Sequence, residues 1–125
     1  MLGSATAHAT IAVSDLGRAR KFYEEVLGFT VIDERSDGIR YQAGGGSSFL
    51  VYPSQFAGTG TSTAMTFLVE DIQKEVSELR ERGVAFEEYD FPGLKTVDGI
   101  AQIQGEKAAW FKDPDGNTLA IGELT

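Results

Sequence analysis

The sequence predicts an α+β protein made of two tandem βαβββ modules, and two internal repeats carry this prediction. Residues 13–16 (Val-Ser-Asp-Leu) recur 56 positions later as residues 69–72 (Val-Glu-Asp-Ile). A turn at residues 43–46 before an apolar run recurs 70 positions later at residues 113–116. At both copies of the first repeat the apolar residues change from a two-residue period, typical of strands, to a helical period. The chain is therefore expected to contain the same supersecondary unit twice.

The first module, residues 5–53, begins with a strand over residues 8–13, where small, polar and β-branched residues alternate. Ser14 or Asp15 is suited to cap the following helix, and Gly28 is suited to end it. Strands are predicted over residues 29–34, 39–42 and 48–52. The glycines at positions 44–46 join the last two strands as a turn.

The second module repeats this order over residues 64–125, after a linker at residues 54–63 that is rich in Gly, Ser and Thr. A strand is predicted first, then a helix capped by Asp71 and ended by Gly83, then a second strand. The long segment that follows contains several glycines and is interpreted as a loop that serves as a lid, is mobile, or forms a dimer contact. A last hairpin surrounds the Asp-Pro-Asp-Gly turn. The predicted strands are residues 65–69, 84–89, 108–112 and 118–124, and the predicted loop is residues 91–107.

The composition indicates one folded domain over residues 1–125. The apolar share of 42% supplies material for a core, and the charged share of 24% is ordinary. The sequence contains no cysteine, which excludes disulfides and thiolate metal sites. A net charge of −8 disfavours nucleic-acid and anionic membrane partners and could attract a cationic ligand. No apolar stretch is long enough for a membrane span and no signal pattern opens the chain, so a cytoplasmic location is expected.

The repeated Val-x-Asp-Leu/Ile junctions and the hairpin of residues 111–117 (Phe-Lys-Asp-Pro-Asp-Gly-Asn) resemble the vicinal oxygen chelate superfamily. That group includes glyoxalase I, extradiol dioxygenases, fosfomycin-modifying enzymes and bleomycin-binding resistance proteins. The resemblance covers nearly the whole chain. It implies eight strands that curl into a cup-shaped mixed sheet around a cavity, with the helices outside, and it implies a homodimer.

The resemblance also implies where a divalent metal would be held, because metal-dependent members supply one ligand from the first and one from the last strand of each module. In this chain those positions are His8, Leu50, Ala64 and Ala120. Three of the four side chains have no donor atom, and one imidazole is too small a ligand set for a divalent cation. Neither a metal nor another cofactor is therefore expected. A divalent-metal lyase or dioxygenase is disfavoured for the same reason.

The side chains expected to face the cup follow from strand alternation. If His8 and Ala120 face it, Tyr52 and Thr66 do so as well. A type I turn with a glycine bulge would set Trp110 opposite Ala120. The 70-residue repeat then places Arg40 at the equivalent position of the first module. A slip of one residue would exchange Trp110 for Phe111 and Arg40 for Tyr41.

Two functional hypotheses fit this pattern, together with a third in which the chain is a purely structural or regulatory dimer. The first is a small-molecule binding protein without metal, with ligand contacts from His8, Arg40, Tyr52, Thr66 and Trp110. The second is a metal-independent isomerase or lyase in which His8 transfers the proton, since imidazole titrates near neutral pH. Arg40 favours an anionic ligand and the net charge a cationic one, so the charge of the ligand stays open.

Overall fold

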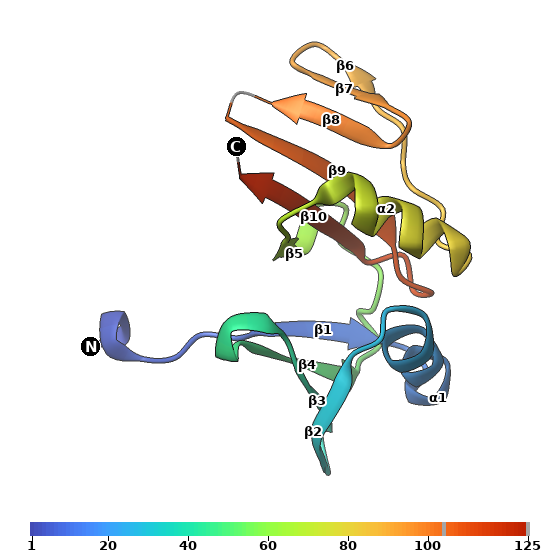
Figure 1. Cartoon of the computed structure of the whole chain (residues 1–125). Helices are drawn as coiled ribbons and strands as arrows, with labels where there is room; N and C mark the ends of the chain where they lie inside the picture. Colours follow the sequence, from blue (N-terminus) through green and yellow to red (C-terminus); the bar gives the residue numbers. More distant parts are fainter. Residues whose placement is uncertain (104, 125) are drawn as a thin grey trace. The chain divides into compact units, whose positions relative to one another are not determined.

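The computed structural model describes residues 1–103 and 105–124, with the side chain at position 124 left out. It divides into two compact units, Met1–Ala57 and Gly58–Thr125. Among the described residues the first contains one sheet with several helical segments, and the second contains one sheet with one helix (Figure 1). The boundary falls inside the predicted linker of residues 54–63. The α+β class predicted from the sequence is confirmed. Neither α1 nor α2, the two α-helices of the described residues, has the length and apolar character needed to cross a bilayer.

The first unit has the predicted order of one strand, a helical segment and three further strands. Its sheet has the order β1-β4-β3-β2, in which β1 and β4 run parallel and the other neighbours run antiparallel. The elements are η1 (Leu2–Ser4), β1 (Ala9–Val13), α1 (Leu16–Arg20), η2 (Lys21–Val26), β2 (Thr30–Arg35), β3 (Gly38–Gln42), η3 (Gly44–Gly46) and β4 (Ser48–Pro53).

The first helical segment begins as predicted and then widens. The Asp15 carboxylate accepts a hydrogen bond of 3.1 Å from the Arg18 N–H and so caps α1. From Lys21 the helix continues as the π-helix η2, in place of the regular helix that the spacing predicts. Two sequence neighbours in η2, Tyr23 and Glu24, contact the same partner: Tyr41 stacks on the Tyr23 ring and donates a hydrogen bond to the Glu24 carboxylate.

The core of the first unit lies between this helical segment and the sheet. Tyr23, Tyr41 and Phe49 are almost fully buried, and their ring centroids are 5.4–6.0 Å apart. The Tyr41 hydroxyl donates a 2.8 Å hydrogen bond to Glu24, which also accepts 2.9 Å from Arg20. Burial, and then the bond to the Glu24 carboxylate, raise the pKa of Tyr41 above its ordinary value. The buried hydroxyl is therefore satisfied as a neutral donor.

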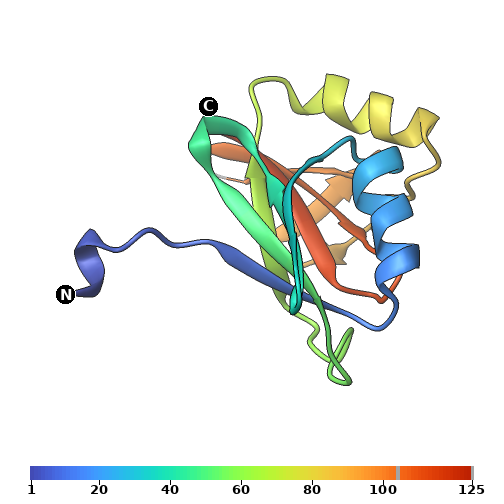
Figure 2. The ribbon, with the colours of Figure 1, turned by 90° about the horizontal axis from the view of Figure 1, so that it is seen from below.

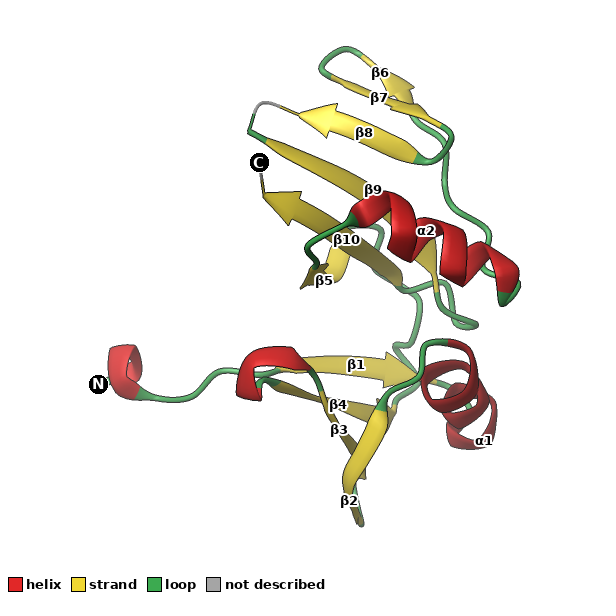
Figure 3. Ribbon diagram, in the orientation of Figure 1, coloured by secondary structure: helices red, strands yellow, loops and turns green. Residues whose placement is uncertain are grey.

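The second unit has a larger sheet, of order β5-β10-β9-β8-β7-β6. The strands β5 and β10 pair in parallel and the others are antiparallel (Figure 3). The elements are β5 (Thr63–Leu68), α2 (Ile72–Glu81), β6 (Asp90–Phe91), β7 (Leu94–Val97), β8 (Ile100–Ile103), β9 (Glu106–Lys112) and β10 (Thr118–Leu124).

Helix α2 packs on β9 and β10 (Figure 2). Its apolar side chains Ile72 and Val76 are buried on this face. The Asp71 side chain caps the helix by accepting 3.2 Å from the Lys74 N–H, as the sequence predicts. A second cap comes from the sheet, because Glu123 on β10 accepts 2.8 Å from the Ile72 N–H. Glu123 thus marks the helix-covered side of the second sheet.

Two sequence predictions in the second unit are wrong. Residues 84–89 do not form a strand, and only Phe86 bridges to Phe111. Residues 91–107 are not a long loop or lid. The described part of this segment contains β7 and β8, joined by a two-residue turn, and Gln104 lies outside the described residues. Asp98 and Gly99 have φ angles of 53° and 82°, which is the geometry of a type I′ hairpin turn.

The modules differ because residues have been added to the second one. Equivalent positions lie 56 apart up to the helix and 70 apart in the final hairpin, so about 14 residues have been inserted between them. The insertion falls between Gly83 and Ile100, where the second unit forms β6 and β7 and the first unit goes directly to its edge strand β2. The repeat is therefore conserved in topology, and the second module carries an extended sheet edge.

Candidate functional site

The candidate site is built on the side of each sheet that faces away from the helix, here called the helix-free face. In the first unit one row across the strands consists of Thr10, Leu50 and Arg40, which are register partners. In the second unit the corresponding row consists of Thr66, Ala120 and Trp110. The two rows are related by the same offsets of 56 and 70 that the sequence shows.

The open question about register is thereby answered. Trp110 lies opposite Ala120, as the turn geometry predicts, and Arg40 lies opposite Leu50. Tyr41 and Phe111, the residues that a one-residue slip would have exchanged for them, are buried at 0% and 1% exposure on the helix-covered side. Strand alternation thus sends the large apolar side chains to the core and leaves Arg40 and Trp110 on the helix-free faces.

The Asp-Pro-Asp-Gly turn holds this register in the second unit. Asp113 is 5% exposed, and its carboxylate accepts 3.0 Å from the Asp115 N–H and 2.9 Å from the Asn117 N–H. The Asn117 side-chain amide donates a further bond of 2.8 Å. Gly116 has a φ of 89°, which suits the left-handed position after a type I turn. These three hydrogen bonds to one buried carboxylate fix the turn and with it the pairing register of β9 and β10.

Trp110 belongs to a group of aromatic rings at the helix-free face. Its ring meets Tyr89 edge-on, with centroids 5.5 Å apart, and Tyr89 stacks on Phe91 at 5.8 Å. Trp110 and Tyr89 are half-buried, and Phe91 is 59% exposed. Next to Trp110 stands the small Ala120, so the indole has no large cross-strand neighbour on β10. Burial raises the pKa of the Tyr89 hydroxyl above its usual value.

Tyr89 is the candidate site residue that the sequence argument missed. It comes from the segment before β6, and the Glu87 N–H of that segment donates 2.8 Å to the Trp110 carbonyl. Thr96 fastens the same segment to β7, because its N–H donates 2.9 Å to the Tyr89 carbonyl. The spacing of Tyr89 and Phe91, two residues apart, could have indicated two aromatic rings on one side of an extended segment.

Arg40 occupies the position equivalent to Trp110 and is engaged within its own sheet. Its guanidinium makes a two-pronged contact with Asp33 on β2, at 2.7 Å and 3.4 Å. This pairing lowers the pKa of Asp33 below its ordinary value, chiefly through the hydrogen bond from Arg40. An anionic ligand at Arg40 would therefore compete with a carboxylate that is already in place.

His8, Tyr52 and Thr66 complete the set of candidate residues. His8 immediately precedes β1 and is exposed, and its side chain makes no hydrogen bond or ion pair within the described residues. Tyr52 is half-buried beside its register partner Ala12, and Thr66 is exposed beside Ala120. The first unit thus presents His8, Arg40 and Tyr52, and the second presents Thr66 and Trp110.

The residues at the positions where related proteins hold a metal do not fit such a group. Leu50 and Ala120 lie on their strands with no donor atom, and Ala64 falls at an irregularity between β5 and β10 where the pairing register shifts. In the part of the chain that the structure describes, no three His, Asp or Glu side chains gather in a way that could hold a metal ion. These positions therefore lack the ligand set that a divalent cation needs.

The sequence matches one known protein family. Residues 5–121 match the family described as the Glyoxalase/Bleomycin resistance protein/Dioxygenase superfamily. No curated protein matches the chain in sequence.

Solved structures share the fold over nearly the whole chain. A glyoxalase/bleomycin resistance protein from Catenulispora acidiphila is 27% identical, with a TM-score of 0.69, over 98% of this chain and 100% of the other. A glyoxalase family protein from Enterococcus faecalis is 27% identical, with a TM-score of 0.71, at the same coverage. TnmS3, an antibiotic-binding protein from a Streptomyces species, is 20% identical, with a TM-score of 0.68, over 98% of each chain.

Proposed function

Because the chain belongs to the glyoxalase/bleomycin resistance protein/dioxygenase superfamily, we propose that it binds a compact aromatic molecule against Trp110 and that it does so without a metal. The observation that carries the proposal is the indole of Trp110, which lies beside the small Ala120 and meets the Tyr89 ring on the helix-free face. A flat ring with one small neighbour is suited to stacking against a planar ligand.

Two further observations support a binding protein. The metal-ligand positions hold Leu50, Ala64 and Ala120, so a Lewis acid that related enzymes use has no ligand set in this chain. TnmS3 shares the fold and is an antibiotic-binding protein, so the fold is compatible with binding an organic molecule. Contact of Thr66 with the same ligand is part of the proposal, and His8, Arg40 and Tyr52 are proposed ligand contacts on the helix-free face of the first unit. A homodimer is also part of it, and light scattering would report twice the 13.5 kDa chain mass.

The direct test is isothermal titration calorimetry with a panel of planar aromatic antibiotics. We expect at least one compound to bind, and Trp110→Ala to weaken its binding about tenfold through loss of the stacking surface. Trp110→Phe keeps an aromatic ring, so its affinity should lie between those of the wild-type protein and Trp110→Ala. Phe56→Ala, which removes an exposed aromatic side chain from the first unit, is the matched control and should leave the affinity unchanged.

Mass spectrometry of the recovered compound separates binding from catalysis. The proposal predicts that the compound returns unchanged. Conversion of the compound that is lost in His8→Gln would instead establish the isomerase or lyase hypothesis. Equal affinity of the wild-type protein and Trp110→Ala would show that the ligand binds elsewhere.

A further inference from the structure

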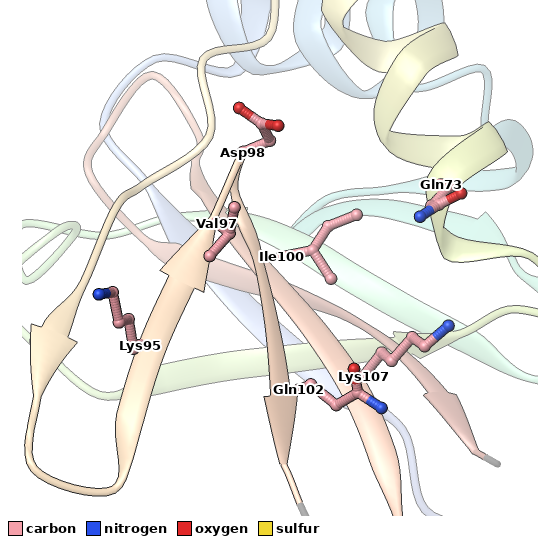
Figure 4. A pocket seen from close by; sticks show the side chains of 7 residues that line it. All are labelled: Gln73, Lys95, Val97, Asp98, Ile100, Gln102 and Lys107. Carbon is pink, nitrogen blue, oxygen red and sulfur yellow. The ribbon is translucent and has the colours of Figure 1, made fainter.

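A second concave site lies in the second unit on the opposite side of the sheet from Trp110. It has a volume of about 430 Å³ and is lined by one residue of α2 together with residues of β7, β8 and β9 (Figure 4). Three of the lining residues, Lys95, Val97 and Asp98, come from the extended sheet edge that the first unit lacks. Its lining side chains include Lys95, Val97, Ile100, Gln102 and Lys107, with Gln73 on α2.

The strand register arranges the lining as two rows on the helix-covered side. Gln102 on β8 pairs with Lys107 on β9, and Lys95 on β7 extends this polar row beyond Gln102. The second row is apolar. It consists of Val97 on β7 and its register partner Ile100 on β8, each two residues from the polar row along its strand. The rows lie side by side because residues two apart in a strand share a face.

The two lysines stand at the two ends of the polar row. One strand lies between them, so their backbones are about 10 Å apart. In Figure 4 they flank Ile100 and Gln102 from opposite sides, and the Lys107 side chain extends toward Gln73. Two ammonium groups can therefore approach one molecule that rests on Ile100.

The charges around the site favour an anion. Neither the Lys95 nor the Lys107 ammonium group forms an ion pair or hydrogen bond among the described residues, in a chain with a net charge of −8. The acid nearest to Lys107 across the strands is Glu123. Its carboxylate accepts a hydrogen bond from the Ile72 N–H at the start of α2. Asp98 is the one acid among the described lining residues, and its carboxylate points away from the other side chains in Figure 4.

We propose that this site binds a small organic carboxylate. Its apolar body rests on Val97 and Ile100, its carboxylate is held by Lys95 and Lys107, and the amides of Gln102 and Gln73 orient it. The combination of an apolar row and an adjacent cationic row selects an amphipathic anion over both a neutral aromatic compound and a free inorganic anion. The site is separate from the Trp110 face, so a ligand can occupy each side of the sheet.

The test is an NMR titration of the ¹⁵N-labelled full chain with naphthalene-2-carboxylate as the probe. Naphthalene-2-carboxamide has the same apolar body without the charge and serves as the matched ligand. We expect the carboxylate to shift the backbone amide signals of β7 and β8, and the carboxamide to bind there at least threefold more weakly. Raising the NaCl concentration should lower the affinity for the carboxylate, because salt screens the charges of the accessible lysines.

Two variants test the residues directly. We expect the affinity for the carboxylate to fall about threefold in Lys95→Gln and likewise in Lys107→Gln, because each substitution removes a partly exposed charge contact. Lys112→Gln is the control, because Lys112 lies on the same strand as Lys107 but five positions along and on the opposite side of the sheet. It should leave the affinity unchanged.

Three results would overturn the proposal. They are shifts confined to the surroundings of Trp110, equal affinity for the carboxylate and the carboxamide, and unchanged affinity in both Lys95→Gln and Lys107→Gln. Spectra of the free variants that match the wild-type protein away from the substitution show that they fold. Both lysine positions are outside the buried core, so folding is expected to persist.

Discussion

An arginine and a tryptophan occupy the same position in the two modules, and their surroundings explain the difference. Arg40 has Asp33 on the neighbouring strand, and the two charges satisfy each other. Trp110 has Tyr89 beside it and Ala120 across the strand, so one face of the indole borders small or aromatic groups. The same backbone row thus carries a self-paired ion in one unit and a ligand-stacking candidate in the other.

The residue with the largest expected effect on the hairpin is Asp113. Asp113→Ala removes a buried carboxylate that accepts three hydrogen bonds from Asp115 and Asn117. We expect the free energy of unfolding to fall by about 2–3 kcal/mol, because the backbone N–H groups lose their partner. Asp113→Asn keeps an acceptor oxygen and should cost less. Urea denaturation would measure both, and an unchanged midpoint in Asp113→Ala would show that the turn does not depend on this carboxylate.

Tyr41 gives the chain a pH-dependent stability at high pH. Its pKa is raised above the ordinary value of 10.0, so below pH 10 both the folded and the unfolded chain keep the phenol protonated. Above pH 10 the unfolded chain loses this proton first, and stability falls by up to about 1.4 kcal/mol per pH unit until the folded-state pKa is reached. Tyr41→Phe cannot titrate, so it should show a shallower decline in urea melts between pH 10 and pH 11.

At neutral pH the same variant reports the bond to Glu24. Loss of the 2.8 Å hydrogen bond should lower the stability of Tyr41→Phe by about 1 kcal/mol, while ring packing with Phe49 is kept. Tyr52→Phe, on the helix-free face, should change stability by less than about 0.5 kcal/mol at this pH. If the difference between wild type and Tyr41→Phe does not narrow as pH rises above 10, the buried phenol does not govern the alkaline decline.

At the scale of the elements, the extended edge of the second sheet depends on the turn between β7 and β8. Asp98 and Gly99 both have positive φ angles, and the hairpin is held to the helix because Arg80 donates 2.8 Å to the Asp98 carbonyl. The Gly99 N–H donates 2.7 Å to the Glu88 side chain. This turn therefore connects the edge of the sheet with both the end of α2 and the segment that carries Tyr89.

Gly99→Ala tests that connection. An added Cβ would lie 2.9 Å from the Arg80 guanidinium and 3.0 Å from the Phe86 Cβ, at a φ of 82°. We expect a loss of about 2–3 kcal/mol, from left-handed strain and from crowding together. Gly93→Ala is the matched control, since Gly93 has a φ of 83° and open space around it, and it should cost only about 1 kcal/mol. Equal losses, measured by thermal or urea unfolding, would mean that the close packing against Phe86 adds nothing.

The elements that the sequence predicted correctly are those encoded by local chemistry. Asp15 and Asp71 cap the helices, and the Asp-Pro-Asp-Gly turn sets Trp110 opposite Ala120. The contact of Trp110 with Tyr89 joins residues far apart in sequence, and no periodic pattern contains it.

The short strands β7 and β8 were missed for a different reason. Each has only four residues, and a polar side chain interrupts its apolar ones, so neither gives a clear apolar alternation. The Asp98-Gly99 pair was the available signal, because this dipeptide favours a type I′ turn. The pairing of Arg40 with Asp33 was equally hidden, since it follows a register shift between Val31 and Asp33 on β2.

At the scale of the whole molecule, the duplication retained the folding signals and not the donors of a metal site. Leu50, Ala64 and Ala120 stand at three of the four positions where the resemblance implies that metal-dependent members supply ligands, and we propose that the chain binds no metal there. We expect the protein purified through a chelator wash to contain no stoichiometric Zn, Ni, Fe or Mn by elemental analysis. Added EDTA should leave the melting temperature unchanged, because no bound ion contributes to folding. Retention of about one metal ion per chain would contradict the metal-free proposal.

The aromatic residues are distributed so that each unit has its own optical reporter. The single tryptophan, Trp110, belongs to the second unit, whereas the stacked pair Tyr23 and Tyr41 belongs to the first. Indole emission excited beyond the tyrosine absorption band therefore follows the second unit alone. The near-ultraviolet circular dichroism of the stacked phenols is weighted toward the first. One unlabelled sample can thus reveal whether the duplicated halves melt as a single cooperative body or in sequence.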